Sequence, residues 1–191
     1  WYGVAAVCAL APFVGAYVAG GWAIRETFEL TALRFAQVSA FLVVVQSVSA
    51  LVTLELAFRR VLIGKPGEAS LATVLVSGLA FGTWSVMVQA DVVNLPIAFA
   101  SGTLIGLIAG GIFALSGSLL VSALYSGGLL GLALTLDATA RIELPSFLLG
   151  QLLRSIVAIN ILIAAVLLVL VYRRSDLGSS VKAKVNDAAG G

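Results

Sequence analysis

Histidine is absent from the sequence of 191 residues, and cysteine and methionine occur once each, at Cys8 and Met87. Haem iron, catalytic zinc and copper centres rely on ligands from these residue types, so the sequence predicts no metal site and no cofactor. A Ser-His-Asp triad and a Cys-His pair cannot form within this chain. A single cysteine also allows no internal disulfide.

Charged residues are scarce as well, at 10% of the sequence, whereas 61% is hydrophobic and the mean hydropathy is +1.13. A soluble domain has about 25% charged residues. The 11 basic and 9 acidic residues are too few to cover a water-exposed surface of this size. We therefore predict an integral membrane protein in contact with the lipid bilayer, in a membrane that the sequence does not identify. The net charge of +2 gives no reason to expect nucleic acid as a partner.

About 20 apolar residues in a helix cross a hydrocarbon core about 30 Å thick. Residues 97–136 carry no charge and are too long for one such helix. The turn-forming triplet 116–118, Ser-Gly-Ser, divides this run into a hairpin of two helices, and the alternative is one long kinked helix. With the hairpin, the predicted fold is all-α and polytopic, with short loops and six transmembrane helices at about 2–24, 30–58, 69–90, 97–115, 119–136 and 147–172.

Basic residues give this bundle an orientation. The 59–68 loop contains three basic residues and the segment after residue 172 contains four, and Lys and Arg accumulate in cytoplasmic loops. Both regions lie on one side only if an even number of spans separates them, which favours six spans over five. We therefore expect both termini in the cytoplasm. The bundle is predicted to occupy residues 1–174, and residues 175–191, rich in Ser, Ala and Gly, to form a disordered cytoplasmic tail.

Small residues recur at intervals of four in several predicted spans. Glycine at this spacing lets two helices approach closely in lipid, because apolar side chains alone gain little from leaving the hydrocarbon. We interpret the stripes as helix-packing surfaces, within the chain or toward partner membrane subunits or a second copy of the chain. Their members are Gly78, Gly82, Gly102, Gly106, Gly110, Gly127 and Gly131.

Polar side chains form stripes on two predicted spans. In the second span they repeat every seven residues, close to two turns of an α-helix, and the third span has the same spacing. Such residues either hydrogen-bond between helices or line a hydrated path. The candidate path consists of Ser39, Gln46, Thr53, Ser77 and Trp84, and Asp91 continues the stripe of the third span.

Arg154 lies about 10 Å into the last span, where an unpaired charge costs about 2.5–3.5 kcal/mol. In the six-span arrangement three other charged residues lie near the same outer side. We therefore consider a charge cluster of Arg154 with Asp91, Arg34 and Glu143, and the alternative is that Arg154 reaches the headgroups alone.

Glu55 and Arg59 lie near the inner end of the second span, four residues apart. A Glu and an Arg at this spacing share a helix face and can pair at the interface. We interpret Glu55 as structural, with a proton relay as the alternative.

Together these features favour a small-solute or ion permease, or the membrane subunit of a transporter, with Arg154 as a substrate or gating charge. The alternative is a non-catalytic structural or accessory subunit of a larger membrane complex, packed through its glycine stripes. We do not expect an enzyme, because acid–base chemistry would depend on Asp91, Glu143 or Glu55 without help from histidine or a metal.

Overall fold

The computed structural model describes residues 1–25, 32–65, 69–88, 95–139 and 146–189, and in these ranges all regular elements are helices. The predicted all-helical fold is therefore confirmed. The π-helix η1 continues α2 without a break, so the described residues form six continuous helical segments. The helices are α1 (Tyr2–Arg25), α2 (Ala32–Ala50), η1 (Leu51–Val61), α3 (Leu71–Val88), α4 (Leu95–Ser116), α5 (Leu119–Thr139) and α6 (Ser146–Ala189).

The uncharged run 97–136 is broken at the predicted triplet. Gly117 has a φ of 75°, a left-handed conformation that glycine adopts without steric cost. Its N–H donates to the Phe113 carbonyl at 2.8 Å and so closes the end of α4. The Ser118 hydroxyl accepts the Val121 N–H and caps the start of α5. The hairpin follows from this turn chemistry.

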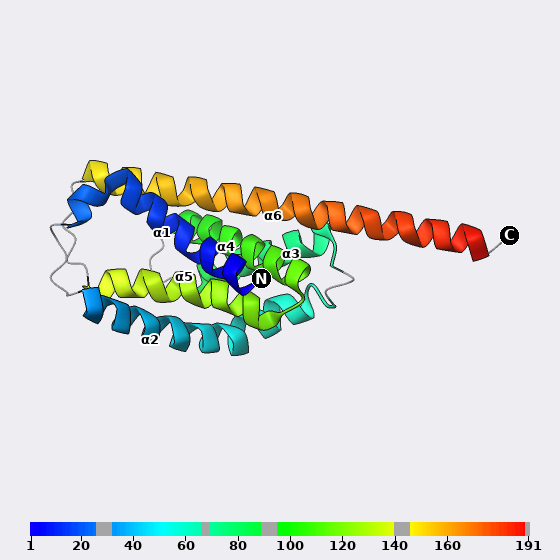
Figure 1. Ribbon diagram of the computed structural model, residues 1–191, viewed down its shortest axis with the longest axis horizontal. Coiled ribbons are helices and arrows are strands. Elements are labelled where there is room, and N and C mark those ends of the chain that lie inside the picture. The colour runs from blue at the N-terminus through cyan, green and yellow to red at the C-terminus, as the bar shows by residue number, and fades with distance from the viewer. Residues whose placement is uncertain (26–31, 66–68, 89–94, 140–145, 190–191) are drawn as a thin grey trace.

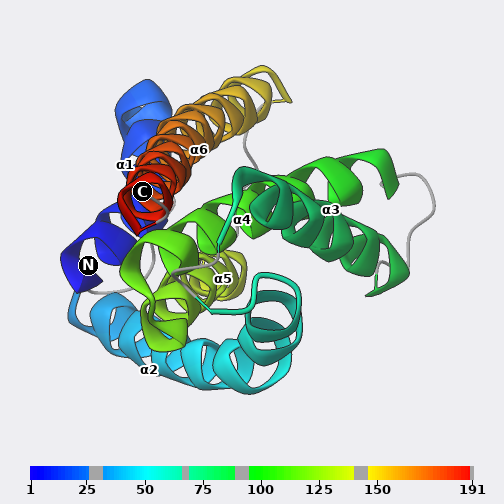
Figure 2. The ribbon, with the colours of Figure 1, turned by 90° about the vertical axis from the view of Figure 1, so that its right-hand side faces the viewer.

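The helices pack in three main pairs: α3 with α4, α2 with α5, and α1 with α6. Figure 2 shows these pairs from one end of the bundle, with α4 and α5 near its centre. A core of mostly small and aliphatic side chains joins α1, α4, α5 and α6 around Ile108, Ile112 and Tyr125. The central helix α4 therefore connects the α3 side of the bundle to the α1–α6 pair.

The glycine stripes lie at two of these helix contacts. A Cβ atom built on Gly106 would lie 3.0 Å from the Gly78 Cα of α3, and one on Gly131 would lie 2.7 Å from the Val43 Cα of α2. The second distance is shorter than real Cβ contacts allow, and at the first distance the α3 backbone would have to give way by a few tenths of an ångström. Glycine at these positions is what allows α3 to approach α4 and α2 to approach α5.

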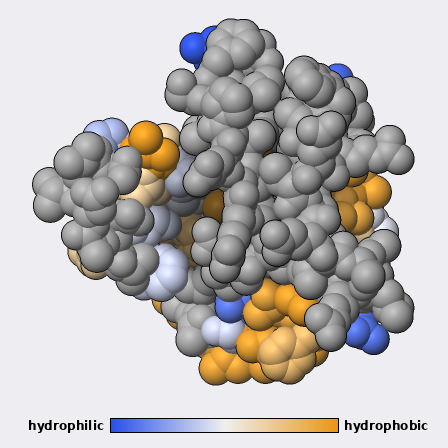
Figure 3. Space-filling model, turned by 90° about the vertical axis from the view of Figure 1, so that its left-hand side faces the viewer, coloured by the Kyte–Doolittle hydropathy of each residue, from blue (hydrophilic) through white to orange (hydrophobic). Residues whose placement is uncertain are grey.

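Large apolar side chains cover much of the outer surface. Phe41 on α2 is 68% exposed and Met87 on α3 is 78% exposed. Apolar atoms also form the lower edge of the molecule in Figure 3, the edge where α2 lies in Figure 1. Among the described residues, Leu95–Ser116 and Ile156–Asp176 are long and apolar enough to cross a membrane, and four further apolar helices are shorter. This surface suits contact with lipid.

Helix α6 continues to Ala189 and projects beyond the rest of the bundle (Figure 1). This differs from the disordered tail expected at 175–191. The segment contains no proline, and Gly178 has no positive φ, unlike Gly117, so its Gly-Ser-Ser stretch lowers helix propensity without ending the helix. The Ser, Ala and Gly content, on which the expectation rested, argues against a packed core but not against continuation of a helix that has already formed.

Candidate functional site

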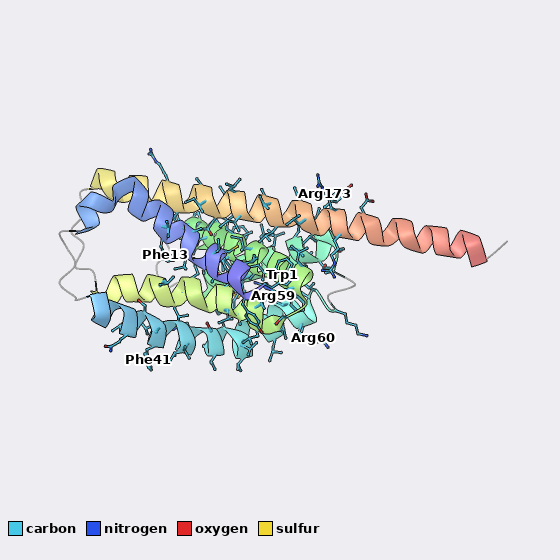
Figure 4. All side chains as sticks on the ribbon, in the orientation of Figure 1. Trp1, Phe13, Phe41, Arg59, Arg60 and Arg173 are labelled. Atoms are coloured by element: carbon cyan, nitrogen blue, oxygen red, sulfur yellow. The ribbon has the colours of Figure 1, made fainter. Side chains whose placement is uncertain are left out.

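A buried arginine is the most unusual feature of the described structure. Arg59 on η1 has 0% of its surface exposed, whereas its neighbour Arg60 is exposed. Figure 4 shows Arg59 within the helix bundle and Arg60 projecting from its edge. A fully buried cation is costly unless protein groups replace its water shell. The groups that contact Arg59 therefore define the candidate site.

Ser77 of α3 contacts the Arg59 guanidinium directly. Its hydroxyl oxygen accepts a hydrogen bond from Arg59 Nη1 at 2.6 Å, and the same hydroxyl donates to the Phe58 carbonyl at 2.8 Å. Ser77 itself is 0% exposed. One serine thus joins α3 to two consecutive residues of η1.

One aromatic ring adjoins the guanidinium, and two more pack against that ring. The Arg59 Cζ atom lies 5.6 Å from the centroid of the Phe81 ring, within the range of a cation–π interaction. Phe81 packs edge-on against Phe58 at 5.4 Å between centroids, and Trp84 lies 5.4 Å from Phe81. Phe58 and Trp84 are half-buried, so the cluster extends from the buried cation toward the surface of the bundle.

The helix that carries Arg59 is itself irregular. A π-helix of 11 residues is rare, and short π-helical stretches within α-helices are frequently found at functional sites. Glu55 lies within η1, four residues before Arg59, so the two positions share one side of the helix. The structure does not describe the Glu55 side chain.

Buried hydroxyls of α5 add to the polar character of the interior. The Ser122 hydroxyl donates to the Ala109 carbonyl of α4 at 2.9 Å. Tyr125, one turn further along α5, is 0% exposed, and its hydroxyl makes no hydrogen bond with the described residues. These groups lie in the centre of the bundle, where water is scarce and electrostatic interactions are strong.

The two predicted polar stripes do not form one face. Helix α2, with Ser39 and Gln46, packs mainly on α5, and α3, with Ser77 and Trp84, packs mainly on α4. Ser39 has a buried hydroxyl without a hydrogen-bond partner among the described residues, and Gln46 is half-buried. Ser77 and Trp84 belong to the Arg59 site instead. The side chain of Thr53 lies outside the description.

The predicted charge cluster around Arg154 stays a prediction. Arg154 is exposed on α6. Asp91 and Glu143 fall outside the described residues, as does the side chain of Arg34 on α2. No group of three His, Cys, Asp or Glu residues that would hold a metal occurs in the part of the chain that was described.

The comparison with protein families bears on these same helices. Residues 36–129 match the family model of the type II CAAX prenyl endopeptidases, described as Rce1-like. The matched segment runs from within α2 to within α5 and contains all of η1, α3 and α4. No curated protein and no solved structure matches the chain. The chain is thus similar to a family of multi-span membrane proteases, and it is an integral membrane protein in contact with the lipid bilayer.

This match corrects the functional prediction. The family is one of peptide-hydrolysing enzymes. The predictions of a permease, of a transporter subunit and of a non-catalytic accessory subunit were therefore wrong. The prediction that the chain is not an enzyme was wrong for the same reason. The reasoning failed because the lack of histidine excludes only histidine-dependent chemistry. A carboxylate can activate water on its own.

The functional interpretation of the glycine stripes needs correction as well. They were interpreted in part as surfaces for partner subunits. The described glycines instead contact helices of the same chain, with Gly78 against Leu107 of α4 and Gly127 against Ser47 of α2. The match to a protease family overturns the glycine zipper as the characteristic feature of this protein.

Sequence reasoning missed Arg59 as a site residue. It was counted among the basic residues of a cytoplasmic loop, and Glu55 was interpreted as its interfacial partner. One signal was available, because Ser77 had been identified as a polar residue within an apolar span. What the sequence did not provide was the contact between that serine and η1, since 18 residues separate Ser77 from Arg59.

Proposed function

We propose that the chain is a membrane-embedded endopeptidase that hydrolyses a peptide bond near a prenylated cysteine. A CAAX sequence is a C-terminal signal for prenylation of its cysteine, which places such a substrate at the membrane. The single observation that carries the proposal is that the family match covers the elements around the buried Arg59. A water-poor polar site inside a helical bundle suits a lipid-modified substrate.

In this proposal Glu55 acts as the general base. It is the one Asp or Glu in the described part of the matched segment. Its carboxylate takes a proton from a water molecule while the water oxygen attacks the carbonyl carbon of the peptide. The proton then passes to the leaving nitrogen as the C–N bond breaks, and the products are a carboxylic acid and an amine. No histidine is required for this sequence of steps.

The role of Arg59 is electrostatic. Attack by water places negative charge on the carbonyl oxygen, and a fixed cation in a water-poor site stabilises that charge more strongly than in water. The contacts with Ser77 and Phe81 hold the guanidinium before the substrate arrives. Arg59 and Glu55 share one side of η1, which favours their acting on one substrate.

The half-buried rings of Phe58 and Trp84 are proposed to receive the prenyl chain. Both adjoin Phe81, which contacts Arg59, so an apolar chain bound there would bring the attached peptide near the cation. Burial of apolar area against aromatic rings is favourable and needs no polar partner.

We further propose that the chain crosses the membrane six times, with both termini on the cytoplasmic side. The helix ends support this topology, because α1 and α5 end, and α2 and α6 begin, at the left end of the molecule in Figure 1. Arg60 and Arg173 lie toward the opposite end in Figure 4, as expected for a shared cytoplasmic side. Single cysteines in place of Ser116 and Ser179, in a Cys8→Ser background, should resist a membrane-impermeant thiol reagent added outside intact cells. Labelling of either would contradict the topology.

The activity is tested with purified protein in liposomes and a short prenylated CAAX peptide. We expect two products that together exceed the mass of the peptide by one water, and much slower cleavage of the unprenylated peptide. Replacing Phe58 and Trp84 with leucine should raise KM for the prenylated peptide and leave the unprenylated one unaffected. Equal cleavage of both peptides by the unmodified protein would contradict the proposed prenyl site.

A further inference from the structure

Ser77 uses both hydrogen-bonding roles of its hydroxyl on one segment of η1. Its oxygen accepts the N–H of Arg59 Nη1 at 2.6 Å, and its hydrogen points to the Phe58 carbonyl oxygen at 2.8 Å. Because the hydrogen is committed to the carbonyl, the oxygen lone pairs are directed toward the guanidinium. The contact therefore has a defined direction as well as a short distance.

A second residue of α3 contacts the same guanidinium. Phe81 lies four residues after Ser77, so both side chains project from one face of α3. The Phe81 ring lies 5.6 Å from Arg59 Cζ. Two groups on one rigid helix thus restrict a side chain that is otherwise long and flexible.

The packing of α3 on α4 keeps this helix face in place. A Cβ atom on Gly78, the residue after Ser77, would meet the Leu107 side chain at 2.7 Å from its Cγ. Helix α3 therefore has little freedom to slide or rotate against α4, and the position of the Ser77 hydroxyl is fixed by the fold.

We infer that Ser77 is a positioning residue that sets the direction of the Arg59 guanidinium for the reaction. The inference rests on the proposed function. The Ser77 hydroxyl uses both its donor and its acceptor role on η1, so it acts through Arg59 and not by contact with substrate. A cation that must stabilise charge in the transition state loses effect when it is displaced by as little as 1 Å.

The test is a set of variants of α3 assayed for cleavage of the prenylated peptide. Ser77→Ala is expected to lower kcat about tenfold to a hundredfold and to leave KM within about twofold, because the misplaced charge acts on the transition state. Ser77→Thr keeps the hydroxyl and should recover most of the loss. The matched control is Ser85→Ala, which removes a hydroxyl from the same helix whose hydrogen bond is to the Phe81 carbonyl of α3 itself.

A double-mutant cycle separates positioning from general damage to the fold. In an Arg59→Met background, Ser77→Ala should have no further effect on kcat, since the residue through which Ser77 acts is gone. An equal loss of kcat in both backgrounds, or a rise in KM with unchanged kcat, would overturn the inference while leaving the proposed function intact.

The thermal midpoint of unfolding gives a readout that does not depend on activity. The two substitutions should be coupled, so that the double variant unfolds at a higher temperature than the sum of the single shifts predicts. Additive shifts of the midpoint would show that Ser77 and Arg59 do not interact. A wild-type protein that binds the prenylated peptide but leaves it uncleaved would overturn the proposed function and this inference together.

Discussion

Arg59 and Arg154 are both arginines within apolar helices, but their surroundings are opposite. Arg59 has 0% exposure, a charged hydrogen bond to Ser77 and an aromatic ring beside it. Arg154 is exposed on α6. An exposed arginine in a membrane helix can extend its side chain toward the headgroups, whereas an enclosed one depends on protein groups. The contrast teaches that the depth of a charge along a helix says less about function than the face on which it lies.

The largest expected effect comes from replacing each arginine in the same way. Arg59→Met should lower the rate of peptide cleavage by about 10²–10³-fold, because it removes a preorganised charge from the site. Arg154→Met should leave the rate within about twofold, since that side chain is exposed on α6. The rate at which each purified variant cleaves the prenylated peptide tests this difference. Similar losses of rate in the two variants would contradict it.

A smaller effect is expected when the same distinction between enclosed and open positions is applied to glycine. Gly106→Leu should lower the free energy of unfolding by about 1–3 kcal/mol, because the new side chain meets Phe81 and the backbone of α3. Gly3→Leu is the matched control, since a Cβ there has nothing within 4 Å. Chemical unfolding in detergent micelles measures both. Equal stability of the two variants would show that α3 and α4 do not need the close approach.

The smallest effect concerns two neighbouring arginines of α6. Arg174 Nη1 donates to the Ala114 and Leu115 carbonyls at 3.0 and 2.8 Å, and so caps the end of α4. Figure 4 shows Arg173 projecting away from the bundle. We expect Arg174→Gln to lower the free energy of unfolding by about 1 kcal/mol and Arg173→Gln to change it by less than about 0.5 kcal/mol. The same unfolding assay measures both variants. A larger loss of stability for Arg173→Gln than for Arg174→Gln would contradict the assignment of Arg174 as the cap of α4.

Much of the fold was predictable because its signals are local. The helix break at Gly117 follows from three consecutive turn-forming residues, and the helix limits follow from the lengths of apolar runs. The continuation of α6 to Ala189 was not predicted, because composition was given more weight than helix propagation. The pairing of α2 with α5 and of α3 with α4 was also beyond the sequence. A glycine stripe indicates that a helix packs closely on another one, but it does not specify which helix is the partner.

The site was harder to predict because it is made by contacts between distant residues. Ser77 and Trp84 were identified as polar residues within an apolar span, but they were grouped with residues of the second span in a candidate path and not with Arg59. Arg59 was treated as a loop residue, since its position near the end of an apolar run is the usual place for an interfacial arginine. Only the packing of α3 beside η1 reveals that Arg59, Ser77 and Phe81 form one buried group.

The most direct test of the central claim is hydrolysis of a prenylated CAAX peptide in H₂¹⁸O by wild-type protein and by Glu55→Gln, with the products identified by mass spectrometry. The account predicts that wild-type protein places ¹⁸O in the new carboxyl group. It also predicts that Glu55→Gln lowers the rate by about 10²–10⁴-fold while the protein remains folded and still binds the peptide. Cleavage by Glu55→Gln at the wild-type rate, or an intact peptide after incubation with folded wild-type protein, would contradict it.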